Sequence, residues 1–231
     1  MPTITDSEFG EIIIRRNAKA SHIKIRVAPD GKLRASLPMY TPIFMVKRML
    51  KTSRKELREM LSEANSQSVY EPFQQIGKSH TLIDRPGSVT KSNVSRHGQQ
   101  IIVARPHDVN FGDESIQRLI REEVKKALRI EAKSYLPRRL SYLADKYDFS
   151  YKKVSFSHAA GRWGSCSSNG TISLNIALMK LPFELIDYVL IHELSHTKQM
   201  NHSSKFWDTV EIGDPNFKEH RRELKEFTPS V

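Results

Sequence analysis

The sequence predicts an α+β fold, with a small antiparallel β-sheet at the N-terminus and an amphipathic helix packed against a mixed or antiparallel sheet farther along the chain. Three observations predict it. Short segments that alternate apolar and polar residues, separated by turn residues, occupy residues 11–37. Apolar residues recur at helical spacing from residue 113 onward and again over residues 182–200. Between these helices, residues 170–176 alternate as a strand does.

The N-terminal region is predicted to contain three strands, over residues 11–16, 22–27 and 32–37. Pro29-Asp30-Gly31 is a strong turn signal between the last two strands. One helix is then predicted from Pro42 to about Asn65, because proline suits a first turn and apolar residues follow at helical spacing.

Residues 66–112 are polar and rich in turn formers, and they indicate strands only over residues 80–83 and 99–104. A long amphipathic helix is predicted from Asp113, and Pro137 is expected to kink or divide it. The remaining predicted elements are strands over 153–157 and 170–176, a helix over 182–200, and short helices over 205–212 and 216–227. The organisation expected from this pattern is a β-rich region with one helix over 1–110 and a second domain over 111–231, or one continuous unit.

The composition favours a protein of a reducing compartment. The 231 residues include one cysteine, Cys166, so no internal disulfide framework can form. No run approaches the 18 or more apolar residues of a membrane span, and the first residues lack the pattern of a secretory signal. We therefore expect a cytoplasmic protein without a membrane partner.

The chain is strongly basic, with 37 Lys and Arg against 26 Asp and Glu and a formal net charge of +11. Such a charge can attract nucleic acid or other acidic partners. It is also consistent with ordinary solvated faces, since the basic residues are dispersed in short pairs, and both interpretations stay open.

His192-Glu193-Leu194-Ser195-His196 is an HExxH segment inside an apolar helical pattern. Two histidines four residues apart lie about 40° apart around a helix and one turn along it, so both rings can reach one metal ion. Glu193 points about 100° away from His192, as suits a residue that touches the water on the metal and not the metal itself. Two ordinary helix histidines are the alternative, and the apolar helix around the motif makes it the weaker one.

A third ligand is predicted at His202, six residues after His196. On a straight helix it would lie about 9 Å farther along and about 240° round, so the helix must end first. We expect the end over residues 199–201, with Asn201 in the left-handed conformation. The alternative third ligands are His220, Asp208, Glu211 and His158.

Three histidines leave the fourth tetrahedral position to water, the arrangement of a catalytic zinc site. The predicted chemistry is hydrolysis of a peptide bond by a zinc-activated water, with one Zn²⁺ per chain and Glu193 as general base. The predicted partner is a protein or peptide substrate.

Gly161-Arg162-Trp163-Gly164 precedes the predicted strand 170–176. Arg162, Trp163 and Gly164 are candidate substrate-binding residues, because an edge strand near the metal can pair with an extended peptide and an arginine can bind a carboxylate. A glycine-bounded hairpin whose Trp163 fills the core is the alternative. Phe206 and Trp207 are expected to pack, and the isolated histidines, His22, His80, His97 and His107, are expected at the surface or in loops.

The runs RWGSCSS, TISLN and DYVLIHELSHTKQMNHSSKFW, in that order, resemble the YgjP-like metallopeptidase family, which is related to the SprT-like and WLM zincins. The N-terminal run RRNAKASHIKIRVAPDGKLRASLP is similar to the same family's N-terminal sheet. The resemblance implies a zincin-like metallopeptidase fold, zinc ligands at His192, His196 and His202, and a catalytic Glu193. Gly161 departs from the family pattern, in which a larger polar or basic residue is expected.

Two other functions remain open on the sequence. One is a nucleic-acid-associated protease that acts on DNA-bound proteins, as the resemblance to SprT-like proteins suggests. The other is a zinc-stabilised interaction module without turnover, which Glu193 disfavours because a purely structural site gains nothing from a base beside its water.

Overall fold

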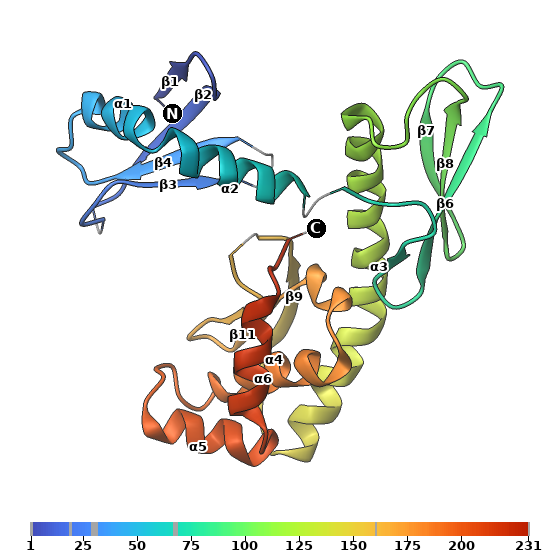
Figure 1. Ribbon diagram of the computed structural model, residues 1–231. Coiled ribbons are helices and arrows are strands. Elements are labelled where there is room, and N and C mark those ends of the chain that lie inside the picture. The colour runs from blue at the N-terminus through green and yellow to red at the C-terminus, as the bar shows by residue number, and fades with distance from the viewer. Residues whose placement is uncertain (1, 19, 29–31, 67–68, 160, 231) are drawn as a thin grey trace. The chain divides into compact units, whose positions relative to one another are not determined.

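A computed structural model describes residues 2–18, 20–28, 32–66, 69–159 and 161–230. The chain forms two compact units, Met1–Val69 and Tyr70–Val231, which are shown together in Figure 1. Helices and several mixed sheets confirm the α+β class. The division lies at residues 69–70, whereas the sequence analysis placed it near 110, because the strands of residues 75–106 pack on the long helix of the second unit.

The first unit has a four-stranded sheet in the order β1-β2-β4-β3. The strands are β1 Thr3–Asp6, β2 Gly10–Arg16, β3 Lys24–Val27 and β4 Leu33–Leu37. The pairs β1–β2 and β3–β4 are antiparallel, but β2 and β4 are parallel, so the sheet is mixed and not purely antiparallel as expected. The predicted turn Pro29-Asp30-Gly31 lies outside the described residues.

Two helices, α1 Ile43–Thr52 and α2 Arg54–Ser66, replace the single helix predicted over residues 42–65. The break falls at Thr52 and Ser53, where the Thr52 hydroxyl donates to the carbonyls of Arg48 and Met49 and competes with the helical bonds. Both helices cover one face of the sheet, as Figure 1 shows. The core of this unit joins the inward residues of the strands to the apolar stripe of the helices: Ile4, Ile12, Ile14, Ile25, Leu33, Ala35, Leu37, Val46, Leu50 and Leu57.

The second unit begins with another four-stranded sheet, in the order β5-β6-β8-β7. Its strands are β5 Gln75–Ile76, β6 His80–Gly87, β7 Asn93–His97 and β8 Gln100–Pro106. The pairs β5–β6 and β7–β8 are antiparallel and β6–β8 is parallel. Order and directions therefore repeat those of β1–β4, a similarity of topology that the sequence does not reveal. β5 and β7 were not predicted, since these strands are short or polar.

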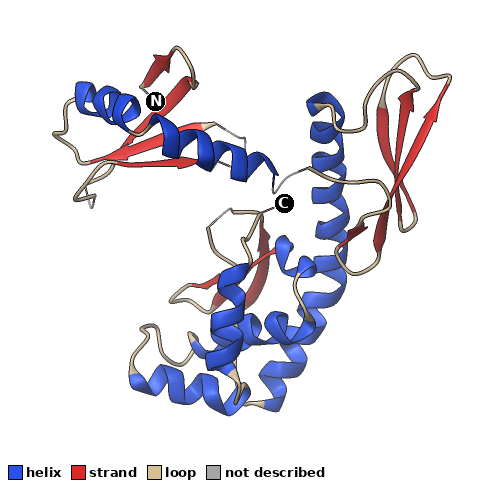
Figure 2. Cartoon of the chain, in the orientation of Figure 1, coloured by secondary structure: helices blue, strands red, loops and turns tan. Residues whose placement is uncertain are grey.

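The long helix α3 runs from Glu114 to Lys146 with Pro137 inside it, and it is not divided as the sequence analysis allowed. Proline in a helix interior costs about 3 kcal/mol. Leu136, Leu140 and Leu143 around it are buried, and each such side chain contributes about 1.5–3 kcal/mol on burial. The packing of both halves of α3 thus outweighs the lost hydrogen bond. Figure 2 shows α3 as one continuous helix that passes beside the strands of the unit.

A three-stranded sheet and five further helical elements complete the second unit. The sheet has the order β10-β11-β9, with β10–β11 antiparallel and β9–β11 parallel. The bounds are β9 Lys153–Ser157, β10 Gly164–Cys166, β11 Thr171–Asn175, the 3-10 helix η1 Ile176–Lys180, α4 Phe183–Ser195, α5 Ser204–Gly213, α6 Phe217–Glu223 and the short η2 Leu224–Glu226. In the described part of the chain, no helix is long and apolar enough to cross a membrane.

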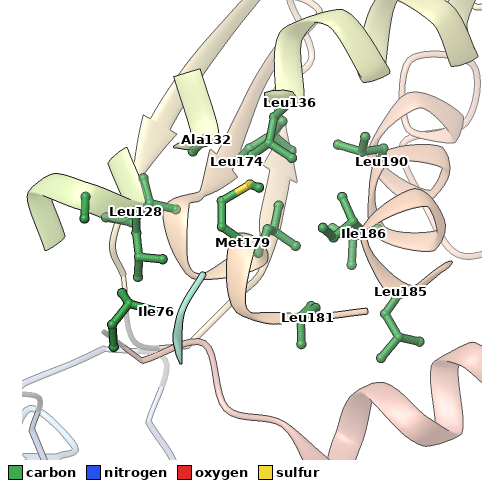
Figure 3. Close-up of a cluster of buried hydrophobic side chains, with 14 of the residues drawn as sticks. Ile76, Leu128, Ala132, Leu136, Leu174, Met179, Leu181, Leu185, Ile186 and Leu190 are labelled. Carbon is green, nitrogen blue, oxygen red and sulfur yellow. The ribbon is translucent and has the colours of Figure 1, made fainter. Parts of the chain in front are cut away.

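The core of the second unit lies between α3, β11, η1 and α4. Figure 3 shows Leu128 and Leu136 of α3, Leu174 of β11, and Ile186 and Leu190 of α4 directed into one cluster. Side chains on most sides of α4 are buried, so neighbouring elements pack against the helix from several directions. A helix in that position is a rigid base for the residues at its C-terminal end.

Glu131, in the middle of α3, fastens the β5–β6 turn. Its carboxylate accepts hydrogen bonds from the backbone nitrogens of Lys78 (2.7 Å) and Ser79 (3.0 Å), and His80 Nδ1 lies 2.6 Å away. Gly77 has φ +60°, and a Cβ there would collide with this carboxylate. His80 is therefore buried and paired, contrary to the expected surface position.

The same turn contacts the start of α4. The Lys78 ammonium donates to the carbonyl of Leu181 and lies 4.2 Å from the centre of the Phe183 ring. Burial acts to raise the pKa of Glu131, but the hydrogen bonds from Lys78, His80 and Ser79 outweigh it and lower the pKa below 4.5. The ionised carboxylate thus links α3 to the β5–β6 turn, and Lys78 of that turn contacts the start of α4.

Glu131→Gln is expected to lower the free energy of unfolding by about 2–3 kcal/mol at pH 7, because hydrogen bonds to a charged acceptor are lost. A carboxyl group with a lowered pKa stabilises above its unfolded pKa and loses that effect as pH falls through the folded pKa. The difference between wild type and variant should therefore shrink in acid. Urea unfolding at neutral pH and below pH 4 measures it. The matched control is Glu122→Gln, an exposed residue of the same helix, and equal losses in both variants would contradict the assignment.

Candidate metal centre

Helix α4 carries His192 and Glu193 in its last turn and ends at Ser195, with His196 as its C-terminal cap. The helix is thus shorter than the predicted range of 182–200. His192 and His196 nevertheless face the same side, since the backbone at His196 keeps helical angles (φ −64°, ψ −19°). Their ring centres lie 4.9 Å apart.

Side chains that bond to nearby carbonyls end the helix. The Ser195 hydroxyl donates to the carbonyl of Ile191 (2.8 Å), and the Thr197 hydroxyl donates to that of Leu194 (2.7 Å). Asn201 was expected to end the helix in the left-handed conformation, which is wrong, because it is not among the residues with positive φ. Its side chain instead accepts a bond from the backbone nitrogen of Ser203 (3.3 Å), just before α5 begins.

The turn after α4 returns His202 to the two helix histidines. One ligand-capable atom from each of His192, His196 and His202 lies within 4.8 Å of the others. The Nε2 atoms of His192 and His202 are 3.3 Å apart. Two imidazole nitrogens on one tetrahedral metal ion, each at about 2.0–2.1 Å, lie about 3.3 Å apart. The spacing therefore fits a shared cation.

The protonation state of His192 and His196 is also the one that metal binding requires. His196 Nδ1 lies 3.1 Å from the carbonyl of Gln199, which makes Nδ1 the protonated donor and leaves Nε2 with a free lone pair. Burial and the neighbouring rings of His196 and His202 lower the pKa of His192 to about 3, and burial lowers that of His196. Neutral imidazole is the form that binds a metal.

Phe206 and Trp207 of α5 hold the three rings in place. Phe206 is fully buried, and its ring centre lies 5.0 Å from that of His192, 4.5 Å from His196 and 4.8 Å from His202. Trp207 stacks on His202 at 5.7 Å. Their expected packing role thus agrees with the geometry.

Glu193 is 5% exposed, and its Oε2 atom has no hydrogen-bond partner among the described residues. Gly164 of β10 makes room for it, because a Cβ at that position would lie 2.6 Å from Glu193 Oε1. Burial raises the pKa of Glu193 to about 8, and the positive charge of Arg162 lowers it in part. A bound divalent cation would favour the ionised form further.

The loop before β10 is held by a residue that sequence reasoning missed. Asn175 is fully buried, and its amide group donates to the carbonyls of Ala159 (2.9 Å) and Arg162 (3.0 Å). Its side-chain oxygen also accepts from Ala177 at the start of η1. The signal in the sequence is an asparagine directly before a run of helical residues, the preferred N-cap.

Two of the predicted substrate-binding residues, Arg162 and Trp163, differ in how exposed their side chains are. Trp163 is half-buried and packs against the main core, whereas Arg162 is exposed. Cys166 on β10 is half-buried, and burial raises the pKa of its thiol, so it behaves as a small apolar residue.

The alternative third ligands do not join the cluster. His220 Nδ1 lies 2.7 Å from Asp214 Oδ2, so that ring is engaged elsewhere. His158 lines a pocket with Glu122, Lys125, Lys126 and Arg129. Within the part of the chain that the structure describes, the three histidines are the group of His, Cys, Asp or Glu side chains placed to hold a metal ion.

An open pocket of about 360 Å³ begins at His196. Its walls are residues 150–152, the β10–β11 turn at 167–170, Thr197 and Met200. Serine, asparagine and threonine side chains dominate the lining, so the pocket suits a polar group next to the histidines.

A family model described as "YgjP-like, metallopeptidase domain" matches residues 21–227. No curated protein matched the sequence. Among solved structures, the metallopeptidase zymogen abylysin of Pyrococcus abyssi aligns with 39% of this chain and 93% of its own, at 31% identity and a TM-score of 0.36. The zymogen jannalysin of Methanocaldococcus jannaschii aligns over the same shares, at 18% identity and a TM-score of 0.35.

His202→Ala is expected to weaken the binding of a divalent metal by at least about 100-fold, since one of three protein ligands is lost. Titration of the apoprotein with Co²⁺, followed by visible absorption, measures the affinity. The matched control is His220→Ala, which removes a nearby imidazole outside the cluster. A Co²⁺ affinity unchanged by His202→Ala would exclude this residue as a ligand.

Proposed function

The chain belongs to the YgjP-like metallopeptidase family, and on that premise we propose that it is a zinc-dependent metallopeptidase with Glu193 as general base. The observation that carries the proposal is the pairing of His192 and His202 nitrogens 3.3 Å apart beside a buried carboxylate whose Oε2 has no described partner. Membership of the family already makes the protein a peptidase that uses a metal ion. The identity of the metal and the roles of the residues are what the proposal adds.

Zinc is the proposed metal, with one ion per chain held by His192, His196 and His202. Three neutral imidazole nitrogens suit zinc, whereas calcium and magnesium prefer oxygen ligands. When bound, the zinc ion would supply a Lewis acid that polarises the scissile carbonyl and makes a water molecule more acidic. The three-ligand set leaves one position open for that purpose.

Glu193 is proposed to move the proton. Its carboxylate accepts a proton from the attacking water and donates it to the leaving amine, so the side chain must alternate between its two forms. A pKa raised by burial brings those two forms closer in energy near neutral pH. The free Oε2 atom supports the role, since an atom already engaged in a hydrogen bond is a poorer acceptor.

The substrate is proposed to be a protein or peptide bound along β10. This strand pairs with β11 on one side, and no strand among the described residues pairs with its other edge, where we propose that an extended peptide backbone adds. Gly164 lies on this strand directly beside Glu193, so a paired peptide would pass close to the base. The exposed Arg162 is proposed to contact a substrate carboxylate, and the pocket at His196 to take a polar side chain.

The same residues disfavour a zinc-stabilised module without turnover. Burying a carboxylate with one oxygen unpaired costs stability, and a structural metal site gains nothing in return. A single cysteine, half-buried, fits a protein of the reducing cytoplasm, which is the proposed location.

Glu193→Gln is expected to lower cleavage of a denatured protein substrate by about 10²–10⁴-fold while one zinc ion per chain is retained. The reason is that the amide cannot accept a proton, although it occupies the same space. Activity and metal content of the same preparation provide the measurement. Glu184→Gln on the exposed part of the same helix is the matched control. If the Glu193→Gln variant is as active as the wild type, Glu193 is not the general base.

Gly164→Ala is expected to lower activity by about 100-fold, because the added Cβ would force Glu193 or β10 aside by several tenths of an ångström or more. The zinc content should stay unchanged, since no ligand is touched. Gly161→Ala is the control in the same loop, where a Cβ meets nothing within 4 Å. If both variants are equally active, the close approach of β10 to the base has no catalytic importance.

A further inference from the structure

Among the described residues that line the pocket at His196, Lys152 is the one with a formally charged side chain, and none of them is acidic. Lys152 is exposed, and its ammonium group has no hydrogen-bond or ion-pair partner in the described part of the chain. His196 belongs to the three-histidine cluster. An unpaired cation and a proposed zinc ligand therefore share one pocket of about 360 Å³.

The backbone at Lys152 is held against the β10–β11 turn. Its nitrogen donates to the carbonyl of Gly170 (2.8 Å). Gly170 has φ +77°, and a Cβ at this position would lie 3.4 Å from the same nitrogen. The turn is closed by a bond from the Gly170 nitrogen to the Ser167 carbonyl (2.9 Å). The side chain of Lys152 thus starts from a backbone position that is fixed at the wall of the pocket.

The polar groups left unengaged in the lining supply hydrogen-bond donors. The side-chain oxygen of Asn169 accepts from the backbone nitrogen of Thr171 (3.2 Å), so the Nδ2 amide group is what Asn169 can offer to a ligand. The hydroxyl groups of Ser150 and Ser168 have no partner among the described residues, and each can donate. With Lys152, the pocket can give several donors to a group that only accepts.

A second cation lies beside the pocket. Lys198 directly follows the lining residue Thr197, and its ammonium group lies 4.5 Å from the centre of the Phe149 ring. Phe149 in turn precedes the lining residue Ser150. Asp148 is the acidic residue nearest to this wall in sequence, and it does not line the pocket. A positive local field raises the concentration of anionic groups in a cleft.

We infer that this pocket binds a carboxylate of the substrate close to the cleaved bond, with Lys152 as the residue that determines the preference. The inference rests on the proposed peptidase function. An ionised carboxylate accepts hydrogen bonds and donates none, so it matches a lining that offers donors and a cation. An apolar side chain in the same place would cover these donors without replacing their bonds to water.

Two sources can supply the carboxylate, an Asp or Glu side chain within a chain and the C-terminus of a peptide. Two series of quenched fluorogenic peptides distinguish them. In the first series the C-terminus is amidated, and one residue beside the cleaved bond, on each side in turn, is Glu, Gln or Lys. In the second series that residue is Gln, and a C-terminus close to the cleaved bond is free or amidated. Mass spectrometry checks the cleaved bond. A preference for Glu assigns the pocket to a side chain, and one for the free C-terminus assigns it to a terminal carboxylate.

The wild type is expected to cleave the peptide with the carboxylate at least about tenfold better in kcat/KM than its neutral counterpart, mainly through KM. Lys152→Gln should reduce this ratio to about twofold or less, because the charge-assisted bond is lost. Lys152→Glu should reverse the preference in favour of the Lys peptide, and Lys152→Arg should keep it. The zinc content should be the same in all of these proteins, since no ligand is changed.

Lys153 provides the matched control. It is exposed and next in sequence, it begins β9, and it is not among the residues that line the pocket. Successive side chains of a strand point to opposite faces, so Lys152 and Lys153 diverge. Lys153→Gln and Lys153→Glu should change the preference by less than about twofold, as expected of a solvated surface charge.

A binding measurement makes the test independent of turnover. The affinity of labelled Glu and Gln peptides for zinc-loaded Glu193→Gln protein is followed by anisotropy, with and without the Lys152 and Lys153 substitutions, and the same preferences are expected. If these preferences hold but the wild type cleaves no peptide, the peptidase proposal fails and the carboxylate site stands. The inference is overturned if carboxylate and neutral peptides are treated alike, if Lys152→Glu leaves the preference unchanged, or if Lys153→Glu alters it as much.

Discussion

The three-histidine cluster depends on the residue at which α4 ends. If the helix continued past His196, His202 would lie about 9 Å along the axis and on another side, and three rings could not share one ion. The bonds that end the helix come from two hydroxyl groups at its C-terminal end, that of Ser195 in the last turn and that of Thr197 just after the cap. The Gln199 carbonyl then serves twice, because it belongs to the reversing turn and also orients the ring of His196.

Packing on both sides of α4 holds the side chains of the three histidines and of Glu193 in place. Phe206 lies close to all three imidazole rings, so α5 supports the three histidines from one side. On the other side β10 approaches so closely that only glycine fits at position 164. Asn175 holds the loop that leads into β10. Glu193 and the three histidines are therefore packed against different elements of one core, β10 in the first case and α5 in the second.

The features of the site that could be predicted are those that depend on the spacing of residues close together in the sequence. Because His192 and His196 are four residues apart, helix geometry predicts that they lie on one side of a helix and that Glu193 points away from His192. The rise and rotation per residue also require the chain to turn back before His202. What could not be predicted rests on partners distant in sequence. Glu131 pairs with His80 from 51 residues away, and no periodicity indicates such a contact. In the fold, the long helix α3 was predicted because its apolar residues recur at helical spacing. The short polar strand β7 and the parallel pairing of β2 with β4 were not predicted.

One buried side chain near the three histidines works against local stability. Glu193 is a buried carboxylate with an oxygen that lacks a described partner, and the cost of burial falls away once a cation lies beside it. Sequences that are otherwise consistent break such rules mainly at functional sites.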